Sequence, residues 1–370
     1  MLLFLTADQN LSAQQKNPFS IMKGVVNNHT KLIFEGEQTS IFLSNKEAIA
    51  TIAKVYRHGK KERLEYIAAN PHPYHVIISD DINTYYLQHD NNVLIEKNFE
   101  EETNLDMNRI ELAFKNYEWK FVRQENFIGK NADVIEAVPY KNKDGFYRFW
   151  VDTKNKLILK KERYDKKGQL SLTTQFTTIK FVKSLPEKLF AVETIGKIVQ
   201  KQHIFISKKI STEDILNHAD FVPKIHKELP QGFLLEGVYM ETNKGKQRLR
   251  FAYSDGLESI SLFETKQTAN RSKKTMNMPQ NNKTNSVNRA EKSHWKMLSW
   301  NDDYINYILV GTINSNALEQ IAVFINGNDL NNRHGTGNTK KIFNYFKRGL
   351  KQLFGCYILF PGITPKLAIC

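Results

Sequence analysis

The stretch from residue 31 to residue 182 is divided into short runs rich in β-branched and aromatic residues. Turn signals such as Asn70-Pro71 and Lys167-Gly168 separate these runs, each of which has the length of a strand. Many closely spaced strands with hairpin turns predict one large antiparallel sheet, curved or partly closed. The predicted strands lie near 31–44, 48–57, 62–69, 74–79, 83–88, 92–96, 118–123, 132–139, 145–152, 156–164 and 169–182.

Two amphipathic segments accompany the predicted sheet. Residues 17–29 place Phe19, Met22 and Val25 on one helical face, and residues 105–116 show a similar period. The order of these segments predicts an α+β fold, in which an unclosed β-barrel wraps around helices. An unclosed sheet leaves a hydrophobic groove that an apolar ligand could enter. Ordinary core packing is the alternative for each predicted lining residue: Phe34, Phe42, Tyr86, Phe146 and Trp150.

The length of 370 residues favours two domains. We expect a barrel domain at 17–200, a linker at 201–228 and a smaller α/β domain at 229–326. Within the smaller domain, residues 266–292 contain no aromatic residue and are rich in Asn, Lys and Ser, which predicts a polar insertion. Residues 327–370 form a tail.

The segment RLRFAYSDGLESISLFE, residues 248–264, predicts a β-hairpin. Asp255-Gly256 is suited to the positive φ of a tight turn, and Ser254 can hydrogen-bond the turn backbone. These preferences explain the turn structurally. The functional interpretation is an exposed edge that recognises an extended partner by β-addition, with Tyr253, Ser254 and Asp255 as the partner-binding residues. The turn does not resemble a catalytic loop.

The net charge of +14 and the isoelectric point near 9.4 favour polyanionic partners, namely nucleic acid, anionic lipid head groups or an acidic protein. No helix-turn-helix or RNA-recognition signature is present, so we expect no nucleic-acid partner. No nucleophile elbow or His-Glu-x-x-His helix occurs. Pro71 and Pro73 prevent His72 and His75 from sharing a helix face. We therefore expect no catalytic residues, no metal and no cofactor.

Both ends of the chain carry further signals. Residues 1–16 contain a short apolar run that no basic residue precedes, which predicts a truncated signal peptide or a frayed end. Residues 339–354 place Ile342, Phe346 and Leu350 on one side of a predicted basic helix. Such a helix is suited to peripheral contact with an anionic membrane, and packing against the chain's own body is the alternative.

Two sequence blocks resemble one known family. The block at 127–169 carries Gly129, Pro139, Tyr147-Arg148, Trp150, Asp152, Asp165 and Gly168, with Lys130 in the place of an arginine. The second block comprises "LPQGFLLEG" at 229–237, the hairpin, and "YINYILVGTINSNALEQIAVFI" at 304–325. Over residues 17–326 the chain is similar to the MucB/RseB family of periplasmic regulators of envelope-stress sigma factors.

The resemblance implies a barrel like that of outer-membrane lipoprotein-sorting proteins, joined to a smaller α/β domain. It implies a periplasmic or extracytoplasmic protein that binds the periplasmic segment of a membrane anti-sigma factor and shields it from proteolysis. Release would follow when lipid, lipopolysaccharide or a lipoprotein acyl chain is sensed. The alternative is a lipoprotein or lipid carrier of the sorting type. Such carriers generally stop after the barrel, so the second domain favours the regulator.

Overall fold

The structure is a computed structural model of the chain. No helix among its described residues is long and apolar enough to span a membrane. It describes residues 16–43, 48–69, 74–80, 83–88, 92–98, 106–141, 145–191, 201–243, 246–267, 288–292, 295–302 and 304–327.

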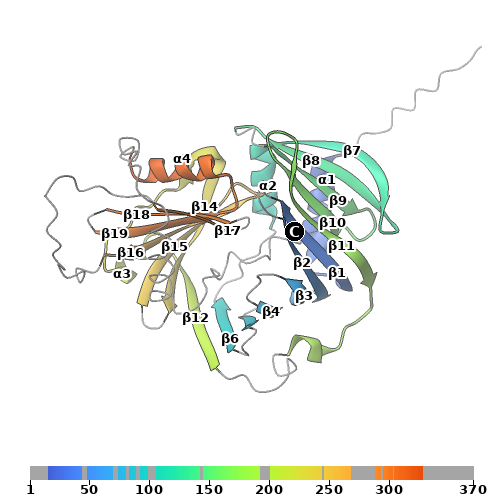
Figure 1. Cartoon of the computed structure of the whole chain (residues 1–370), viewed down its shortest axis with the longest axis horizontal. Coiled ribbons are helices and arrows are strands. Elements are labelled where there is room, and N and C mark those ends of the chain that lie inside the picture. Colours follow the sequence, from blue (N-terminus) through green and yellow to red (C-terminus); the bar gives the residue numbers. More distant parts are fainter. Residues whose placement is uncertain are drawn as a thin grey trace, which may run out of the picture.

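The described part of the N-terminal domain, residues 16–191, contains two α-helices and eleven strands (Figure 1). All the strands and both helices predicted for this region are present, which confirms the α+β class. The helices are α1 (Pro18–His29) and α2 (Met107–Asn116), and the short 3-10 helix η1 (Glu187–Phe190) follows the last strand. The strands are β1 (Ile33–Leu43), β2 (Ala48–His58), β3 (Lys61–Ala69), β4 (Tyr74–Ser79), β5 (Asn83–Gln88), β6 (Asn92–Asn98), β7 (Tyr117–Phe127), β8 (Lys130–Pro139), β9 (Phe146–Asp152), β10 (Ile158–Tyr164) and β11 (Leu170–Phe181).

Two antiparallel meanders make up the sheet of this domain. β1 to β6 pair in sequence, β7 to β11 pair in sequence, and β1 pairs with β11 to join the two series. No pairing between β6 and β7 closes the sheet among the described residues. The sheet is therefore strongly curved but unclosed, as predicted from the succession of short strands.

Both helices pack on the same side of the curved sheet. Asn17 caps α1 by accepting a hydrogen bond from the Phe19 backbone, and Asp106 caps α2 in the same way from Arg109. Apolar residues of both helices join β8 and β9 in one core, which includes Ile21 and Phe149. This helix-facing side of the sheet is the inside of the barrel.

The C-terminal domain, residues 201–327, has a sheet covered on one face by α4 (Figure 1). Its own core contains Phe251, Tyr307 and Leu318 and includes no residue of the N-terminal domain. The strands are β12 (Lys201–Ile210), β13 (Glu228–Leu229), β14 (Phe233–Asn243), β15 (Lys246–Ser254), β16 (Ser259–Lys266), β17 (Asn288–Lys292), β18 (Trp295–Asn301) and β19 (Ile305–Gly311). The helices are α3 (Ile215–His218), the 3-10 turn η3 (Pro230–Gly232) and α4 (Ser315–Ile325).

Strand β12 connects the sheets of the two domains. Its residues from Lys201 to Ser207 pair in parallel with β6, and those from Ile206 to Ile210 pair antiparallel with β14. The predicted linker at 201–228 thus begins with a strand that hydrogen-bonds to both domains. The predicted signal peptide up to residue 15, most of the polar insertion (268–287) and the tail from 328 onward, including 339–354, lie outside the described residues.

One buried carboxyl group interrupts an otherwise apolar row of the C-terminal sheet. Glu264 pairs with Leu249 on one side and with Tyr307 on the other, and none of its surface is exposed. Its Oε2 accepts a hydrogen bond from the Lys224 backbone at 3.3 Å, whereas its Oε1 has no hydrogen-bond partner. Burial raises the pKa of Glu264 to about 8, so the group is mostly protonated at neutral pH.

We predict that Glu264→Gln removes a pH dependence of folding stability. The folded chain keeps this proton up to about pH 8, whereas the unfolded chain loses it near pH 4.5. Stability of the wild-type chain should therefore fall, by at most about 1.4 kcal/mol per pH unit, as the pH rises through this window, and level off above it. Urea unfolding at pH 5 to 9 measures the effect. An advantage of Glu264→Gln that does not grow with pH would contradict the buried neutral acid.

Candidate functional site

The turn between β15 and β16, residues 254–258, is called the hairpin tip. Asp255 Oδ1 accepts hydrogen bonds from the backbones of Leu257 at 2.9 Å and Glu258 at 2.7 Å. Ser254 Oγ donates to the Glu258 carbonyl oxygen at 2.9 Å, and Gly256 adopts a φ of +101°. The predicted turn chemistry of Ser-Asp-Gly is therefore present. These hydrogen bonds fix the position of Glu258 at the end of the hairpin tip.

The hairpin tip inserts into the N-terminal domain. Leu257 packs into the core formed by α1, α2, β8 and β9, where its neighbours include Ile110 and Tyr117. Burying one leucine side chain contributes ~2 kcal/mol to the contact. Gly256 lies directly against α2, because a Cβ atom at this position would stand 2.2 Å from the Ala113 backbone nitrogen. The two domains therefore meet through close backbone contact that only glycine permits.

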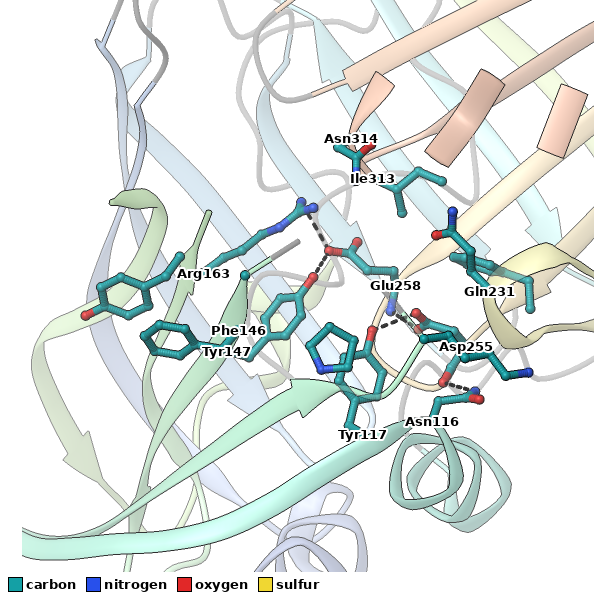
Figure 2. Close-up of a pocket in the computed structure, with 15 residues that line it drawn as sticks. Asn116, Tyr117, Phe146, Tyr147, Arg163, Gln231, Asp255, Glu258, Ile313 and Asn314 are labelled. Carbon is teal, nitrogen blue, oxygen red and sulfur yellow. Dashed lines mark hydrogen bonds and ion pairs between the residues drawn. The ribbon is translucent and has the colours of Figure 1, made fainter. Parts of the chain in front are cut away.

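Asp255 is bound by two side chains of the N-terminal domain. Tyr117 Oη donates to Asp255 Oδ2 at 2.6 Å, and Asn116 Nδ2 donates to the Asp255 carbonyl oxygen at 2.9 Å (Figure 2). Asn116 Nδ2 also lies 3.1 Å from the carbonyl oxygen of Gly232, so one amide connects two loops of the C-terminal domain. Burial raises the pKa of Asp255 to about 6, although the Tyr117 hydroxyl acts in the opposite direction. Burial and Asp255 together raise the pKa of Tyr117 well above its ordinary value.

Glu258 is the second acidic residue at this contact, and hydrogen-bond donors surround it. Tyr147 Oη donates to Oε1, Thr312 Oγ1 donates to Oε2, and Arg163 Nη1 lies 3.2 Å from Oε1. Arg163 also donates to the Thr312 carbonyl oxygen at 2.7 Å. Burial would raise the pKa of Glu258, but the charges of Arg163 and Lys161 and the hydroxyl donors outweigh it and lower this pKa. Glu258 is therefore ionised and paired.

These contacts form one continuous joint between the domains. An ion pair between Arg109 and Glu236 extends the joint on the other side of α2. A small cavity of about 50 Å³ opens beside the paired groups. Its lining includes both acidic residues and both tyrosines of the joint, together with Asn116, Pro139, Lys141, Gly145, Phe146, Arg163, Tyr164, Gln231, Phe233, Ile313 and Asn314 (Figure 2).

The hairpin is not an exposed sheet edge, so that part of the sequence interpretation is wrong. β15 pairs with β14 and β16, and β16 pairs with β15 and β19. Tyr253 and Ser254 are buried, and Asp255 is enclosed by the N-terminal domain. The sequence could not show this, because alternation marks a strand equally well at the edge or in the middle of a sheet. All three residues therefore make contacts within the fold, and Asp255 also contacts the N-terminal domain.

The residues predicted to line a groove divide between the two faces of the barrel sheet. Trp150 pairs with Lys160, and the pairing continues through Gln175 to Thr39, so Trp150 shares a face with Thr39. Phe34 and Phe42 lie an odd number of residues from Thr39 on the same strand, which places them on the opposite face. The pairs from Gly36 through Val55, Leu64 and Ile77 place Tyr86 on that opposite face as well.

On β9, the aromatic residues on the helix-facing side are Tyr147 and Phe149. They are the sequence neighbours of the predicted Phe146 and Trp150. Phe149 pairs through Lys161 and Thr174 with Ser40, on the face of Phe34. Tyr147 and Phe149 thus face the helices, whereas Phe146 and Trp150 face the other way. Phe34, Tyr86 and Trp150 are fully buried in the domain core. These three residues belong to one hydrophobic cluster, and the role of all five in ligand binding stays a prediction.

Sequence reasoning missed Glu258 of the hairpin tip and the partners of the tip in the N-terminal domain, namely Tyr117, Tyr147 and Arg163. One signal was available, because the tip concentrates acidic residues in a strongly basic chain. A buried carboxylate requires a cation or several donors. Nothing in the sequence indicated which distant strands would supply them.

We predict that Gly256→Ala separates the domains. The added methyl group would collide with the backbone of α2 and would also have to adopt a positive φ. We expect a loss of about 2–4 kcal/mol in the free energy of unfolding and a larger radius of gyration in X-ray scattering. Gly129→Ala is the control, since Gly129 has φ +73° and no atom within 4 Å. Equal effects of the two substitutions would contradict close docking.

We predict that Tyr117→Phe weakens the joint in a pH-dependent manner. The substitution leaves the buried Asp255 carboxylate without its side-chain donor, which costs about 1–3 kcal/mol when the carboxylate is charged. The loss should be larger at pH 8 than at pH 5, because Asp255 gains a proton near pH 6. Chemical unfolding at both pH values measures it, with the exposed Tyr140→Phe as the control. A loss independent of pH would show that the hydroxyl does not serve the ionised Asp255.

Comparison with known proteins finds similarity to the barrel domain and to the overall fold. Residues 22–194 match the family model described as the MucB/RseB N-terminal domain. The MucA/MucB complex of Pseudomonas aeruginosa has a TM-score of 0.52 and 15% sequence identity, and the match covers 82% of this chain and 96% of that chain. A second structure, MucB in complex with MucA(peri), gives the same TM-score and identity and covers 83% and 97% of the two chains. No curated protein sequence matches the chain significantly. At this identity the structural matches show a common fold.

Proposed function

We propose that the chain is an extracytoplasmic regulatory protein that binds the periplasmic segment of a membrane anti-sigma factor, because residues 22–194 match the model of the MucB/RseB N-terminal domain. By this binding it restrains an envelope-stress sigma factor, and it has no enzymatic activity. The observation that carries the proposal is the family match together with a fold shared, across both domains, with MucB in complex with MucA(peri).

The joint between the domains supports a binding role. Buried hydrogen bonds, an apolar contact and ion pairs fix the two domains against each other. Because the domains are fixed, their surfaces are already in one arrangement before a partner binds. This lowers the entropy cost of binding a partner that contacts both domains. Separation of the domains would destroy such a composite surface. The joint is therefore suited to the control of partner binding.

The proposed sensing of lipid or of mislocalised lipoprotein depends on the barrel. The unclosed sheet has an apolar, helix-facing side, which includes Phe149 and Tyr147. In the described residues α1, α2 and the hairpin tip cover this side. An acyl chain would therefore have to displace one of these elements, and displacement of the hairpin tip would transmit the event to the C-terminal domain. Contact of the 339–354 segment with an anionic membrane would keep the protein near its partner.

The direct test is binding of the purified chain to the periplasmic segment of the single-pass anti-sigma factor from the same genome. We expect calorimetry to give a dissociation constant of about 1 μM or tighter for the wild-type chain. Gly256→Ala should bind at least about tenfold more weakly, and Gly129→Ala should bind like the wild type. Absence of wild-type binding, with acyl-chain lipids recovered from the purified protein by mass spectrometry, would overturn the regulator in favour of a lipoprotein or lipid carrier.

A further inference from the structure

One row of side chains crosses the C-terminal sheet. Leu249, Glu264, Tyr307 and Trp300 lie side by side in it, one on each of β15, β16, β19 and β18. Glu264 has no exposed surface, and Trp300 is 3% exposed. Glu264 Oε1 and Trp300 Nε1 have no hydrogen-bond partner among the described residues. Two polar atoms of this row are therefore buried without the hydrogen bonds that water would give them, which is costly.

Residues 219–227, called the covering segment, lie over this row and form neither a helix nor a strand. The Lys224 backbone N–H donates to Glu264 Oε2 at 3.3 Å. The Lys224 ammonium group lies 5.3 Å from the Tyr307 ring centroid and 3.4 Å from Asp302 Oδ2. Lys224 thus holds the covering segment over both Glu264 and Tyr307.

The rest of the covering segment is largely exposed to water. Phe221 packs partly against the core, whereas Val222 is 76% exposed and Ile225 is 39% exposed. An exposed ion pair joins Asp220 Oδ2 to Lys266 Nζ at 3.1 Å, and such pairs contribute little to stability. A segment with exposed apolar side chains and no regular secondary structure can open locally without unfolding the domain.

Charged and titratable groups face Glu264 from several elements. Lys224 favours an ionised Glu264, whereas Asp302 disfavours it, so their charges oppose each other. Burial together with Glu264 raises the pKa of Tyr253. Burial, Asp302 and Glu264 raise the pKa of Tyr307. Both hydroxyl groups therefore stay protonated near neutral pH.

An ionised Glu264 is poorly accommodated under the covering segment. Burial and Lys224 lower the pKa of His226, which is therefore neutral near neutral pH, and α4 adds the apolar Leu318 and Ile321 to the same core. A charged Glu264 would have one backbone donor at Oε2, and its Oε1 would be unpaired. A buried carboxylate with so few donors is costly, whereas water would satisfy both oxygens if the segment moved away. Ionisation therefore favours the open segment.

We propose that the covering segment is a proton-controlled lid, which closes over protonated Glu264 and opens when this residue ionises, exposing the row from Leu249 to Trp300. The lid goes beyond the proposed function and does not depend on it. In the closed state Glu264 keeps its proton up to about pH 8, whereas in the open, hydrated state it loses the proton near pH 4.5. Between these values the ratio of open to closed chains rises with pH, by at most about tenfold per pH unit, and above them it levels off.

Hydrogen exchange of the full-length chain, followed by mass spectrometry at pH 6, 7 and 8, tests the lid. The measured quantity is the protection factor of peptides that cover residues 219–227, which corrects for the pH dependence of intrinsic exchange. We expect the wild-type protection factor to fall at least about tenfold from pH 6 to pH 8. In Glu264→Gln and Glu264→Met, which lack the titrating group, it should change less than about twofold. Methionine extends the apolar row with a side chain of similar length, so Glu264→Met is informative even if a buried amide disturbs folding.

Two controls separate the lid from other causes of exchange. Glu228→Gln removes an exposed acidic group next to the covering segment and should keep the wild-type pH dependence. Urea below the unfolding transition distinguishes local opening, which exposes little surface, from global unfolding, which also exposes β15. The lid is overturned if the wild-type protection factor does not fall with pH or if the fall persists in a folded Glu264 variant. It is also overturned if urea accelerates exchange of residues 219–227 as steeply as that of β15. The chain is measured alone, so the result is independent of binding to the anti-sigma segment.

Discussion

The arrangement of the two domains depends on two acidic residues buried at the end of a barrel. Asp255 and Glu258 leave water when the hairpin tip enters the N-terminal domain, and each must find donors there. Tyr117 donates a hydrogen bond to Asp255, while Tyr147 donates a hydrogen bond to Glu258 and Arg163 forms an ion pair with it. Leu257 between them adds an apolar contact. These few groups, together with the pairing of β12 with β6, hold the two domains against each other.

This joint connects regions that are otherwise built independently. The C-terminal core contains no residue of the barrel, and the only strand that pairs with both described sheets is β12. Glycine at 256 is needed for contact with α2, and Asn116 at the end of α2 bonds to two loops. Helix α2 is therefore part of the barrel core on one side and part of the joint on the other. A disturbance inside the barrel can reach the C-terminal domain through this helix or through the hairpin tip.

The sequence was sufficient for the elements and insufficient for their contacts. Alternation and turn residues predicted the eleven barrel strands, and helical periodicity predicted α1 and α2, because these signals are local. The turn at Asp255-Gly256 was also predictable from its backbone preferences. Register is not local, and a shift of one residue reverses the face of a side chain. For that reason Phe146 and Trp150 were predicted to line the groove, whereas Tyr147 and Phe149 face the helices. The barrel donors around Glu258, Tyr147 and Arg163, lie on strands more than ninety positions away in the chain, and only the fold brings them together.

The central claim is that Glu258 binds directly to the barrel through Arg163. A double-mutant cycle of Arg163→Met and Glu258→Gln, followed by urea unfolding of the full-length chain, measures this most directly. Direct pairing predicts a coupling energy of about 1.5 kcal/mol or more between the two substitutions. Additive effects, within about 0.5 kcal/mol, would show that the two side chains do not interact and would contradict the joint described here.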